Sequence, residues 1–300
     1  MDQTSTHDPG DGHDHTQTVT ADNERRIRFV FVFTAGYAAI QGVGGWLSGS
    51  LALIADSGHM VSDAAALLLA LIAYRMARRP ADASQTYGYH RVRVLAALAN
   101  GASLLLLVAW IAWEAVNRIN QPVEVLAGPM LIVATIGLLV NLAGAWVLSS
   151  GNRSDANLRG AFLHVLGDLL GSVGAIAAAV GIMMTGWTIL DPILSIGVAL
   201  LVVRSAWSLV ADSIRVLMQA VPRGLDAPKV EKSLATLPEV ATAGHFHAWT
   251  LTDDTIVATV HVVPSANVDP LSLPKLVAER LKTDYAIDHV TVQVDPPEAG

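Results

Sequence analysis

The chain has 300 residues, of which 52% are hydrophobic and only 15% charged, and its mean hydropathy is +0.46. This composition differs from that of ordinary soluble domains and indicates that lipid surrounds part of the protein. The sequence contains no cysteine, which excludes disulfides, thiolate metal sites and cysteine nucleophiles. A net charge of -7 argues against a nucleic-acid partner, because phosphates require clustered positive charge.

Residues 1–25 form a polar, acidic tail that we expect to be disordered and cytosolic. The tail lacks the basic start and apolar run of a cleaved signal peptide. Three imidazoles and three carboxylates lie in it: His7, Asp8, Asp11, His13, Asp14 and His15. These side chains could collect metal weakly, and the alternative is a solubilising tail that needs no ligand.

Residues 26–218 contain six apolar stretches, each about 20 residues or longer, the length that spans a hydrocarbon core about 30 Å thick. We place the six spans at residues 27–48, 51–75, 92–117, 125–149, 160–185 and 192–211. Gly49 and Ser50 interrupt the first apolar run and predict a tight turn between two spans. The sequence therefore predicts a six-helix transmembrane domain.

Arginines near helix ends predict the orientation, because they are retained on the cytoplasmic side. Most of them lie before the first span or beside the second and fourth loops: Arg25, Arg26, Arg28, Arg75, Arg78, Arg79, Arg91, Arg93, Arg153 and Arg159. Only Arg118 lies on the opposite side, so both termini are expected in the cytosol. Arg204 is expected near the cytoplasmic end of the sixth span, where its side chain can reach the interface.

Residues 219–300 have the composition of a soluble domain. Their periodicity predicts helices and strands in the order αββαβ: a helix over 227–237, strands over 240–251 and 255–263, a helix over 272–284 and a strand over 289–294. An Asp253-Asp254 turn joins the first two strands. This order is typical of a small cytosolic two-layer α+β domain of ferredoxin-like type.

Four ionisable residues in the spans form two pairs with the same spacing. His59 and Asp63 lie four residues apart in the second span, as do His164 and Asp168 in the fifth, so each pair shares a helix face. Each charge in a bilayer costs roughly 2.5 to 3.5 kcal/mol on insertion scales. Two imidazoles and two carboxylates suit tetrahedral zinc. The alternative is an internal hydrogen bond within each pair.

Other polar residues in the spans allow simpler interpretations. Asp56 lies one turn before His59 and could be an exit or hydration group, or a carboxylate that stabilises the start of a helix. Asn100 and Asn141 are expected to form hydrogen bonds between helices. His90, in the loop before the third span, is expected to act in packing or anchoring at the interface.

A second group of histidines lies in the terminal domain. His245, His247 and His261 fall on paired strands, and His289 and Asp295 flank the last strand. Alternation along a strand places His245 and His247 on one face. Surface histidines without a ligand explain this pattern equally well.

Several segments are similar to the cation diffusion facilitators, and specifically to their zinc-transporting bacterial members. The segments are GGWLSGSLALIADSGHMVSD, TYGYHRVRVLAALANG, HVLGD and DPILSIGVALLVVRSAWSLVADSIRVLMQAVP. The resemblance implies six spans, a metallochaperone-like cytosolic domain, a homodimer, and metal export in exchange for protons. It also implies a transport site at His59, Asp63, His164 and Asp168.

The resemblance further implies regulatory metal ligands at His245, His261 and Asp295. Some members have a further histidine where this chain has Gln293, which puts that site in doubt. We also note His247 as a candidate ligand beside these three.

We therefore expect an integral protein of the bacterial inner membrane that exports zinc, or cadmium, cobalt or nickel, from the cytosol. Its expected partners are the lipid bilayer, the metal, protons and a second copy, with no prosthetic group. The alternatives are a metal-gated sensor or channel and an intramembrane zinc enzyme. An enzyme is disfavoured because four protein ligands leave no open position and the chain has no HExxH-type base.

Overall fold

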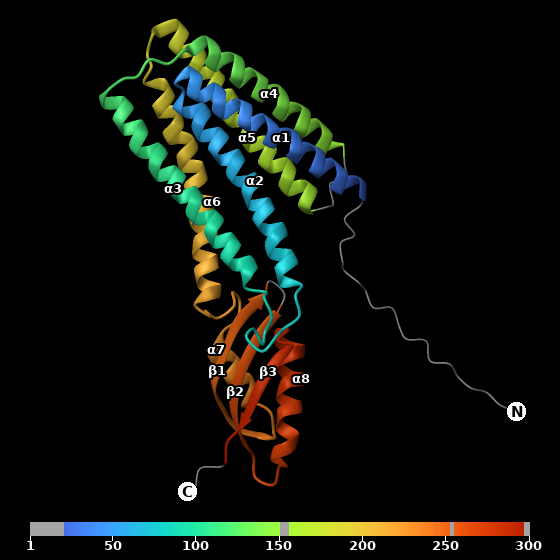
Figure 1. Cartoon of the computed structure of the whole chain (residues 1–300). Coiled ribbons are helices and arrows are strands. Elements are labelled where there is room, and N and C mark those ends of the chain that lie inside the picture. Colours follow the sequence, from blue (N-terminus) through green and yellow to red (C-terminus); the bar gives the residue numbers. More distant parts are fainter. Residues whose placement is uncertain (1–20, 151–155, 253–254, 297–300) are drawn as a thin grey trace, which may run out of the picture. The chain divides into compact units, whose positions relative to one another are not determined.

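The computed structural model describes residues 21–150, 156–252 and 255–296 (Figure 1). Six long helices precede a small mixed domain, and the elements are α1 (Ala21–Ser48), α2 (Leu51–Ala77), α3 (Val92–Asn120), α4 (Ala127–Ser149), α5 (Ala156–Thr185), α6 (Leu190–Leu217), α7 (Ala227–Leu234), β1 (Val240–Thr252), β2 (Thr255–Pro264), the short helix η1 (Pro270–Ser272), α8 (Leu273–Tyr285) and β3 (His289–Val294). The histidine-rich tail, Arg153 and the Asp253-Asp254 turn lie outside the described residues.

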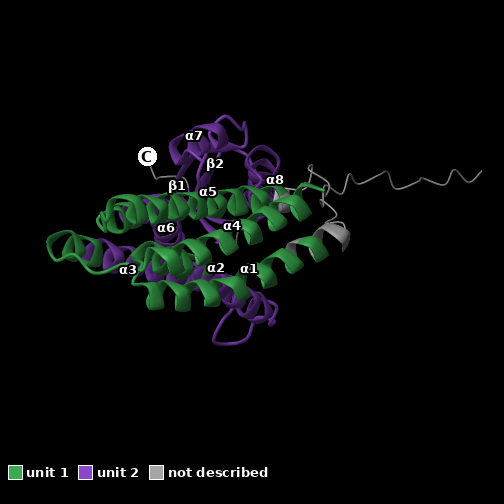
Figure 2. Cartoon of the chain, turned by 90° about the horizontal axis from the view of Figure 1, so that it is seen from above, with its two compact units in different colours: residues 1–60, 114–195 green, residues 61–113, 196–300 purple. Residues whose placement is uncertain are grey.

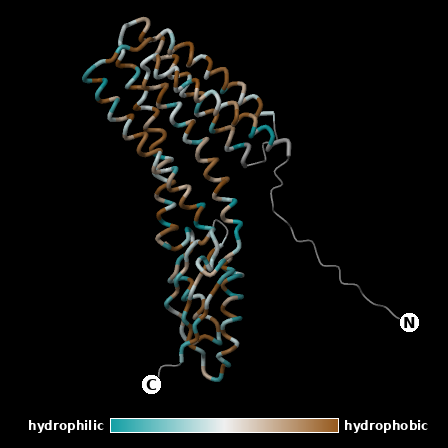
Figure 3. Tube along the Cα trace, viewed as in Figure 1, coloured by the Kyte–Doolittle hydropathy of each residue, from teal (hydrophilic) through white to brown (hydrophobic). Residues whose placement is uncertain are grey.

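Each of the six long helices is long and apolar enough to cross a membrane, which confirms the predicted spans. Figure 3 shows the hydrophobic colouring along them. The sixth helix is longer than predicted at both ends, because it continues through polar residues that hydropathy places outside a span. Arg204 lies, exposed, in the middle of this longer helix.

The chain divides into two compact units, residues 1–60 with 114–195 and residues 61–113 with 196–300 (Figure 2). The first unit contains α1, α4 and α5, the start of α2, the end of α3 and the start of α6. The second contains the remainder of α2, α3 and α6 together with the terminal domain.

Small residues let the helices of the first unit approach closely. A Cβ atom on Gly137 of α4 would lie 2.5 Å from the Tyr37 hydroxyl of α1, and one on Gly42 would lie 2.7 Å from Ser57 Oγ of α2. Close approach of this kind is the usual way in which membrane helices gain packing energy. Tyr37 also donates a hydrogen bond to the backbone oxygen of Val133.

The start of α2 is capped by a residue that lies far away in sequence. The fully buried Asp191, in the first turn of α6, accepts hydrogen bonds from Ser50 Oγ at 2.6 Å and from the backbone N–H of Leu51 at 2.7 Å. The N–H of Ala52 donates to the same carboxylate at 3.2 Å. Because the first N–H groups of a helix lack partners within it, this carboxylate stabilises the start of α2.

Arg118, the arginine expected opposite the others, belongs to the same network. Its Nη1 lies 3.8 Å from the Asp191 carboxylate and donates to the backbone oxygen of Gly49, and its Nε donates to Glu114 at 2.8 Å. Gly49 has a φ of +72°, which permits the tight turn predicted between α1 and α2. Arg118 therefore has a structural role in joining three helix ends.

Asparagines connect helices within each unit. In the first unit, Asn141 Nδ2 of α4 donates to Ser172 Oγ of α5 at 3.3 Å. In the second, Ser62 Oγ of α2 donates to Asn100 Oδ1 of α3 at 3.2 Å. The expectation that these two asparagines form hydrogen bonds between helices is confirmed.

The terminal domain has the predicted αββαβ order and two layers. Its sheet has the strand order β1-β2-β3, with β1 and β2 antiparallel and β2 and β3 parallel. Helices α7 and α8 pack on the face that presents Ala258, Val260 and Val262, all fully buried. The opposite orientation of alternate residues leaves His261 on the other face.

Candidate metal centre

Two histidines from distant parts of the sequence meet in the first unit. The ring centroids of His59 on α2 and His164 on α5 lie 5.8 Å apart at an interplanar angle of 66°. A ring nitrogen of each lies within 4.8 Å of one of the other. This separation allows both imidazoles to bind one metal ion after small rotations of the side chains.

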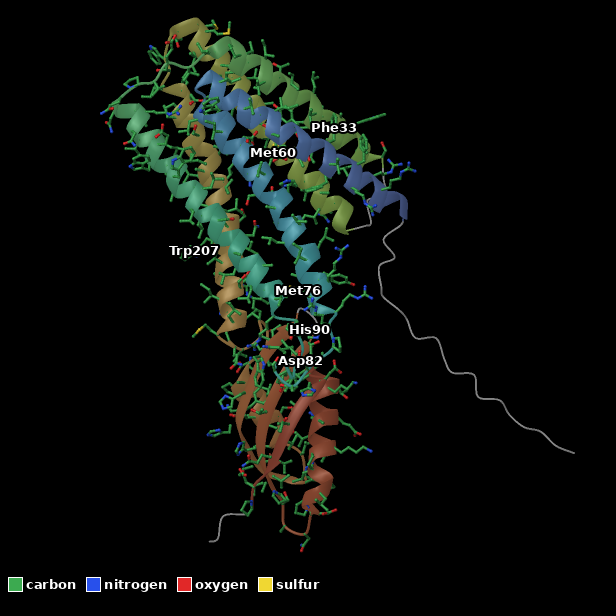
Figure 4. All side chains as sticks on the ribbon, in the orientation of Figure 1. Phe33, Met60, Met76, Asp82, His90 and Trp207 are labelled. Carbon is green, nitrogen blue, oxygen red and sulfur yellow. The ribbon has the colours of Figure 1, made fainter. Side chains whose placement is uncertain are left out.

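Buried neighbours hold both imidazoles in place. Met60, labelled in Figure 4, follows His59 and packs with Tyr37 of α1 and Val140 of α4. Val165 follows His164 and packs in a cluster with Val30 of α1. These apolar contacts anchor the helix segments that carry the two histidines.

The two carboxylates of the predicted set follow one turn after the histidines. Asp168 is buried, and its Oδ2 lies 3.6 Å from His164 Nε2. Asp63 follows His59 along the same continuous helix, with a carboxylate oxygen within 4.8 Å of a His59 ring nitrogen. Each span thus presents an imidazole with a carboxylate beside it, a donor set that fits zinc.

Asp56 is not a carboxylate at the start of a helix, which is one of the two roles considered for it. It lies beyond the first turn of α2, which contains no acidic residue, so the interpretation as a helix-start carboxylate is wrong. Asp191 occupies that role. Asp56 is buried inside the first unit and accepts a hydrogen bond from Gln41 Nε2 of α1 at 2.6 Å.

Sequence reasoning missed Gln41 and Asp191. Gln41 is uncharged, so a search for charged groups in the first span passes over it, although an amide in an apolar span is itself a signal. Asp191 precedes Pro192 and fell just outside the expected sixth span. An Asp-Pro pair before an apolar run is a recognisable mark of a helix start.

Three histidine rings come together in the terminal domain. The centroid of the His245 ring lies 5.6 Å from that of His247 and 5.1 Å from that of His261. A bulge between Gly244 and His247 interrupts the alternation of β1, and His245 has a φ of +53°. Burial still alternates here, with Phe246 buried between the exposed His245 and His247, so the two rings share a face as predicted.

Asp295 completes this group from the end of β3. His261 Nδ1 lies 2.9 Å from Asp295 Oδ2, and Gln293 Nε2 donates to Asp295 Oδ1 at 2.8 Å. These hydrogen bonds from Gln293 and His261 hold the pKa of Asp295 below its usual range. Gln293 therefore orients the carboxylate in this structure.

His289 and His90 lie apart from these groups. The ring of His289 meets that of Tyr87 edge to face, with centroids 6.0 Å apart. His90 lies in the loop between α2 and α3, near Asp82 (Figure 4). The exposed Asp82 accepts from Ser84 and from the Tyr89 hydroxyl, which lowers the pKa of Asp82 and raises that of Tyr89.

The fold and these side chains define a class: a polytopic membrane protein with metal-ligand residues inside its spans and a small appended α+β domain. Comparison with known families assigns both regions. Residues 27–218 match the cation efflux transmembrane domain, and residues 222–297 match the cytoplasmic domain of cation efflux proteins.

Curated relatives cover nearly the whole chain. The zinc transporter ZitB of Pectobacterium atrosepticum is 45% identical over 94% of this chain and 88% of its own length. ZitB of Escherichia coli is 43% identical over 94% and 91% of the two chains. A Bacillus subtilis protein named cadmium, cobalt and zinc/H(+)-K(+) antiporter is 37% identical over 95% and 92%.

Among solved structures, the metal-bound C-terminal domain of the CzcD transporter is 32% identical to this chain, with a TM-score of 0.22. It covers 24% of this chain and 99% of its own.

The chain belongs to the cation diffusion facilitator family, as the resemblance of its spans predicted. It is an integral membrane protein that transports metal cations, and it is not an enzyme.

Proposed function

We propose that the chain exports zinc from the bacterial cytosol in exchange for protons, through His59, Asp63, His164 and Asp168. The observation that carries this proposal is the pairing of the His59 and His164 rings across two apolar helices. Each ring has a carboxylate one turn further along its helix. The names of the relatives in Pectobacterium and Escherichia, which specify zinc, agree with it.

The donor set favours zinc over other biological divalent ions. Two imidazoles and two carboxylates match the coordination number and borderline softness of zinc. Magnesium and calcium prefer more oxygen ligands, and copper(I) prefers sulfur. Cadmium, cobalt and nickel tolerate the same ligands, and a Bacillus relative is named for cadmium and cobalt as well as zinc.

Proton exchange follows from the chemistry of imidazole. A histidine must be neutral to bind metal, so a proton and the metal compete for the same ring nitrogen. Protonation of His59 and His164 from one side of the membrane would release the metal there. Binding from the other side would release the protons.

We infer that both termini lie in the cytosol, so that residues 1–25 and the terminal domain face the metal supply. The arginines beside the α2–α3 loop support this orientation. Arg118, the exception, is held by Glu114 and Gly49 and is explained by helix packing.

A transport assay in liposomes with zinc and pH indicators tests the proposal. Zinc entering the lumen should be matched by protons leaving it, and a pH gradient imposed with equal zinc on both sides should drive zinc movement. Zinc flux without linked proton flux would contradict the coupling. A zinc current driven by voltage alone would indicate a channel.

We further infer that His245, His261 and Asp295 bind a regulatory metal ion, with His247 as the additional imidazole, and that this domain mediates a homodimer. The adjacent rings and the contact between His261 and Asp295 support the site. Zinc titration of the purified protein, with the transport histidines replaced, should show binding that is lost in His261→Ala.

A further inference from the structure

A cluster of oxygen-bearing side chains lies inside the first unit, beside the transport residues. It consists of Gln41 on α1, Asp56 on α2, Asn141 on α4 and Ser172 on α5, and we call it the oxygen cluster. All four residues are at least nine-tenths buried, with exposed fractions of 2%, 8%, 1% and 3%. No part of this cluster belongs to the proposed transport site.

Two hydrogen bonds and one close approach connect the cluster. Gln41 Nε2 donates to Asp56 Oδ2 at 2.6 Å, and Asn141 Nδ2 donates to Ser172 Oγ at 3.3 Å. A Cβ atom on Gly171, the neighbour of Ser172, would lie 3.3 Å from Asp56 Oδ1. Glycine at this position therefore lets the α5 backbone lie against the Asp56 carboxylate.

Two acceptors in the cluster have no donor. Gln41 Oε1 and Asn141 Oδ1 are buried and accept no hydrogen bond from the described part of the chain. Buried polar atoms nearly always have partners, and those that lack one often mark a place for water or an ion. Each amide donates one hydrogen bond to a neighbour, and its oxygen accepts none among the described residues, so both oxygens remain available as ligands.

The donors suit a weakly held cation. The cluster offers one carboxylate, two amide oxygens and a hydroxyl, and no nitrogen or sulfur ligand. Oxygen ligands of this kind bind hard or partly hydrated divalent ions, and they hold zinc less tightly than imidazoles do. The cluster lacks a lysine or arginine contact to Asp56 among the interactions that the structure describes.

The cluster lies toward one end of the membrane helices. Asp56 precedes His59 by three residues, which is about 5 Å along the helix axis toward Leu51. Ser172 follows Asp168 by four residues on α5, which runs in the corresponding direction away from His164. The oxygen cluster therefore lies beyond the two imidazoles in the direction of Leu51.

We propose that the oxygen cluster is a second, weaker binding position for the transported divalent cation. The cluster receives the ion after the ion leaves His59 and His164. It then passes the ion toward the end of α2 at Leu51. This inference rests on the proposed function, since it assumes that those two histidines hold the ion beforehand.

Zinc transport into liposomes tests the position. Asp56→Asn keeps the shape and the hydrogen bond from Gln41 but removes the charge, so the maximal rate should fall about tenfold with the apparent KM within about twofold. Asn141→Leu should lower the rate more than Asn100→Leu, the same change at an asparagine outside the cluster.

A binding measurement separates a cation position from a purely structural role. In the full chain carrying His59→Ala and His164→Ala, Mn2+ serves as a hard-cation probe, and its bound fraction is measured by electron paramagnetic resonance. Adding Asp56→Asn should remove one Mn2+ per chain, whereas adding Asp212→Asn, an exposed carboxylate, should remove none.

The outcomes are distinct from those of the proposed function. If the wild-type protein moves no zinc, the proposed function fails. If the wild type moves zinc and Asp56→Asn matches it, the second position is overturned. It is also overturned if no Mn2+ binding depends on Asp56, or if Asp56→Asn abolishes tight zinc binding, because the residue would then support the fold of the main site.

Discussion

Two groups of histidines in this chain occupy opposite environments. His59 and His164 lie on helices that are apolar enough to span a membrane, whereas His245, His247 and His261 lie on the open face of a small sheet. The sheet packs its core on the other face without them. A polar group inside a span is costly, while one on an exposed sheet face costs little.

A histidine inside a membrane span is therefore a stronger functional signal than one on an exposed sheet face. In the membrane helices, the cost of each ionisable group makes its presence informative, and the structure places two imidazole rings with their centroids 5.8 Å apart. In the terminal domain, the proximity of the histidine rings is weaker evidence for a metal site. There the signal comes from the bulged backbone at His245 and the contact between His261 and Asp295.

The largest effect should come from the membrane ligands. Asp168→Ala should lower zinc transport in liposomes at least about 100-fold, because the proposed transport site loses one of its four zinc ligands. His247→Ala in the terminal domain is the matched comparison and should stay within about threefold of wild type. Equal losses in both variants would mean that the membrane site matters no more for transport than the histidines of the terminal domain.

The next effect concerns the buried carboxylate that caps the start of α2. Asp191→Ala removes the acceptor for Ser50 Oγ and two backbone N–H groups, and leaves Arg118 with less compensation. The free energy of unfolding should fall by about 3 kcal/mol. Thermal unfolding in detergent measures the loss.

Asp212→Ala provides the exposed counterpart of that change. Its ion pair with Arg223 is open to solvent, so the same measurement should show a change below about 1 kcal/mol. A comparable loss in both variants would mean that the cap at Asp191 adds no stability.

In a variant that lacks the transport histidines, His261→Ala in the terminal domain should remove the stabilisation that zinc gives to the folded protein. Ligand binding raises the unfolding temperature only while the site is intact. With the transport histidines in place, zinc transport should fall only about two- to fivefold in His261→Ala, because the site in the terminal domain is proposed to regulate transport and does not carry the ion. A zinc-dependent shift in unfolding temperature that persists in His261→Ala would exclude this histidine as a ligand.

Acid should release zinc from this domain through its histidines and not through Asp295. The pKa of Asp295 is lowered in the folded protein, so its contribution is present above its ordinary pKa and is lost only as the pH falls through the lowered value. A histidine must be neutral to bind metal, so protons compete with zinc for its ring nitrogen. Zinc bound in a variant that lacks the transport histidines should therefore dissociate on acidification while Asp295 is still ionised.

Asp295→Asn checks the assignment. It should weaken zinc binding across the range while the midpoint of acid release stays in place. A midpoint that moves to lower pH in this variant would assign the titration to Asp295.

The smallest effect should follow deletion of residues 1–20. Weak collection of metal by the tail would change the apparent affinity for cytosolic zinc by about twofold and leave the maximal rate unchanged. Complete loss of transport on deletion would show that the tail has a required role.

Hydropathy and helical spacing predicted the six spans and the two His-Asp pairs, because a membrane helix must satisfy its own backbone and exclude most polar groups. Those constraints are local and can be seen in one sequence. The contacts of Gln41, Asp191 and Gln293 could not be predicted in this way, since each depends on which distant element packs beside it. The bulge at His245 likewise depends on strand pairing. Within it, the backbone N–H of Phe246 donates a hydrogen bond to Glu231 Oε1 of α7.

The cap at the start of α2 also bears on how the protein is made. The groups that satisfy the first N–H groups of this helix come from Asp191, which emerges from the ribosome long after the first two spans. Until Asp191 is in place, the first N–H groups of α2 lack this acceptor and must find hydrogen-bond partners in water or in the insertion machinery. Correct closure of that end is therefore a late event of biosynthesis, and a chain truncated before the sixth span should be recognised as unfinished by membrane quality control.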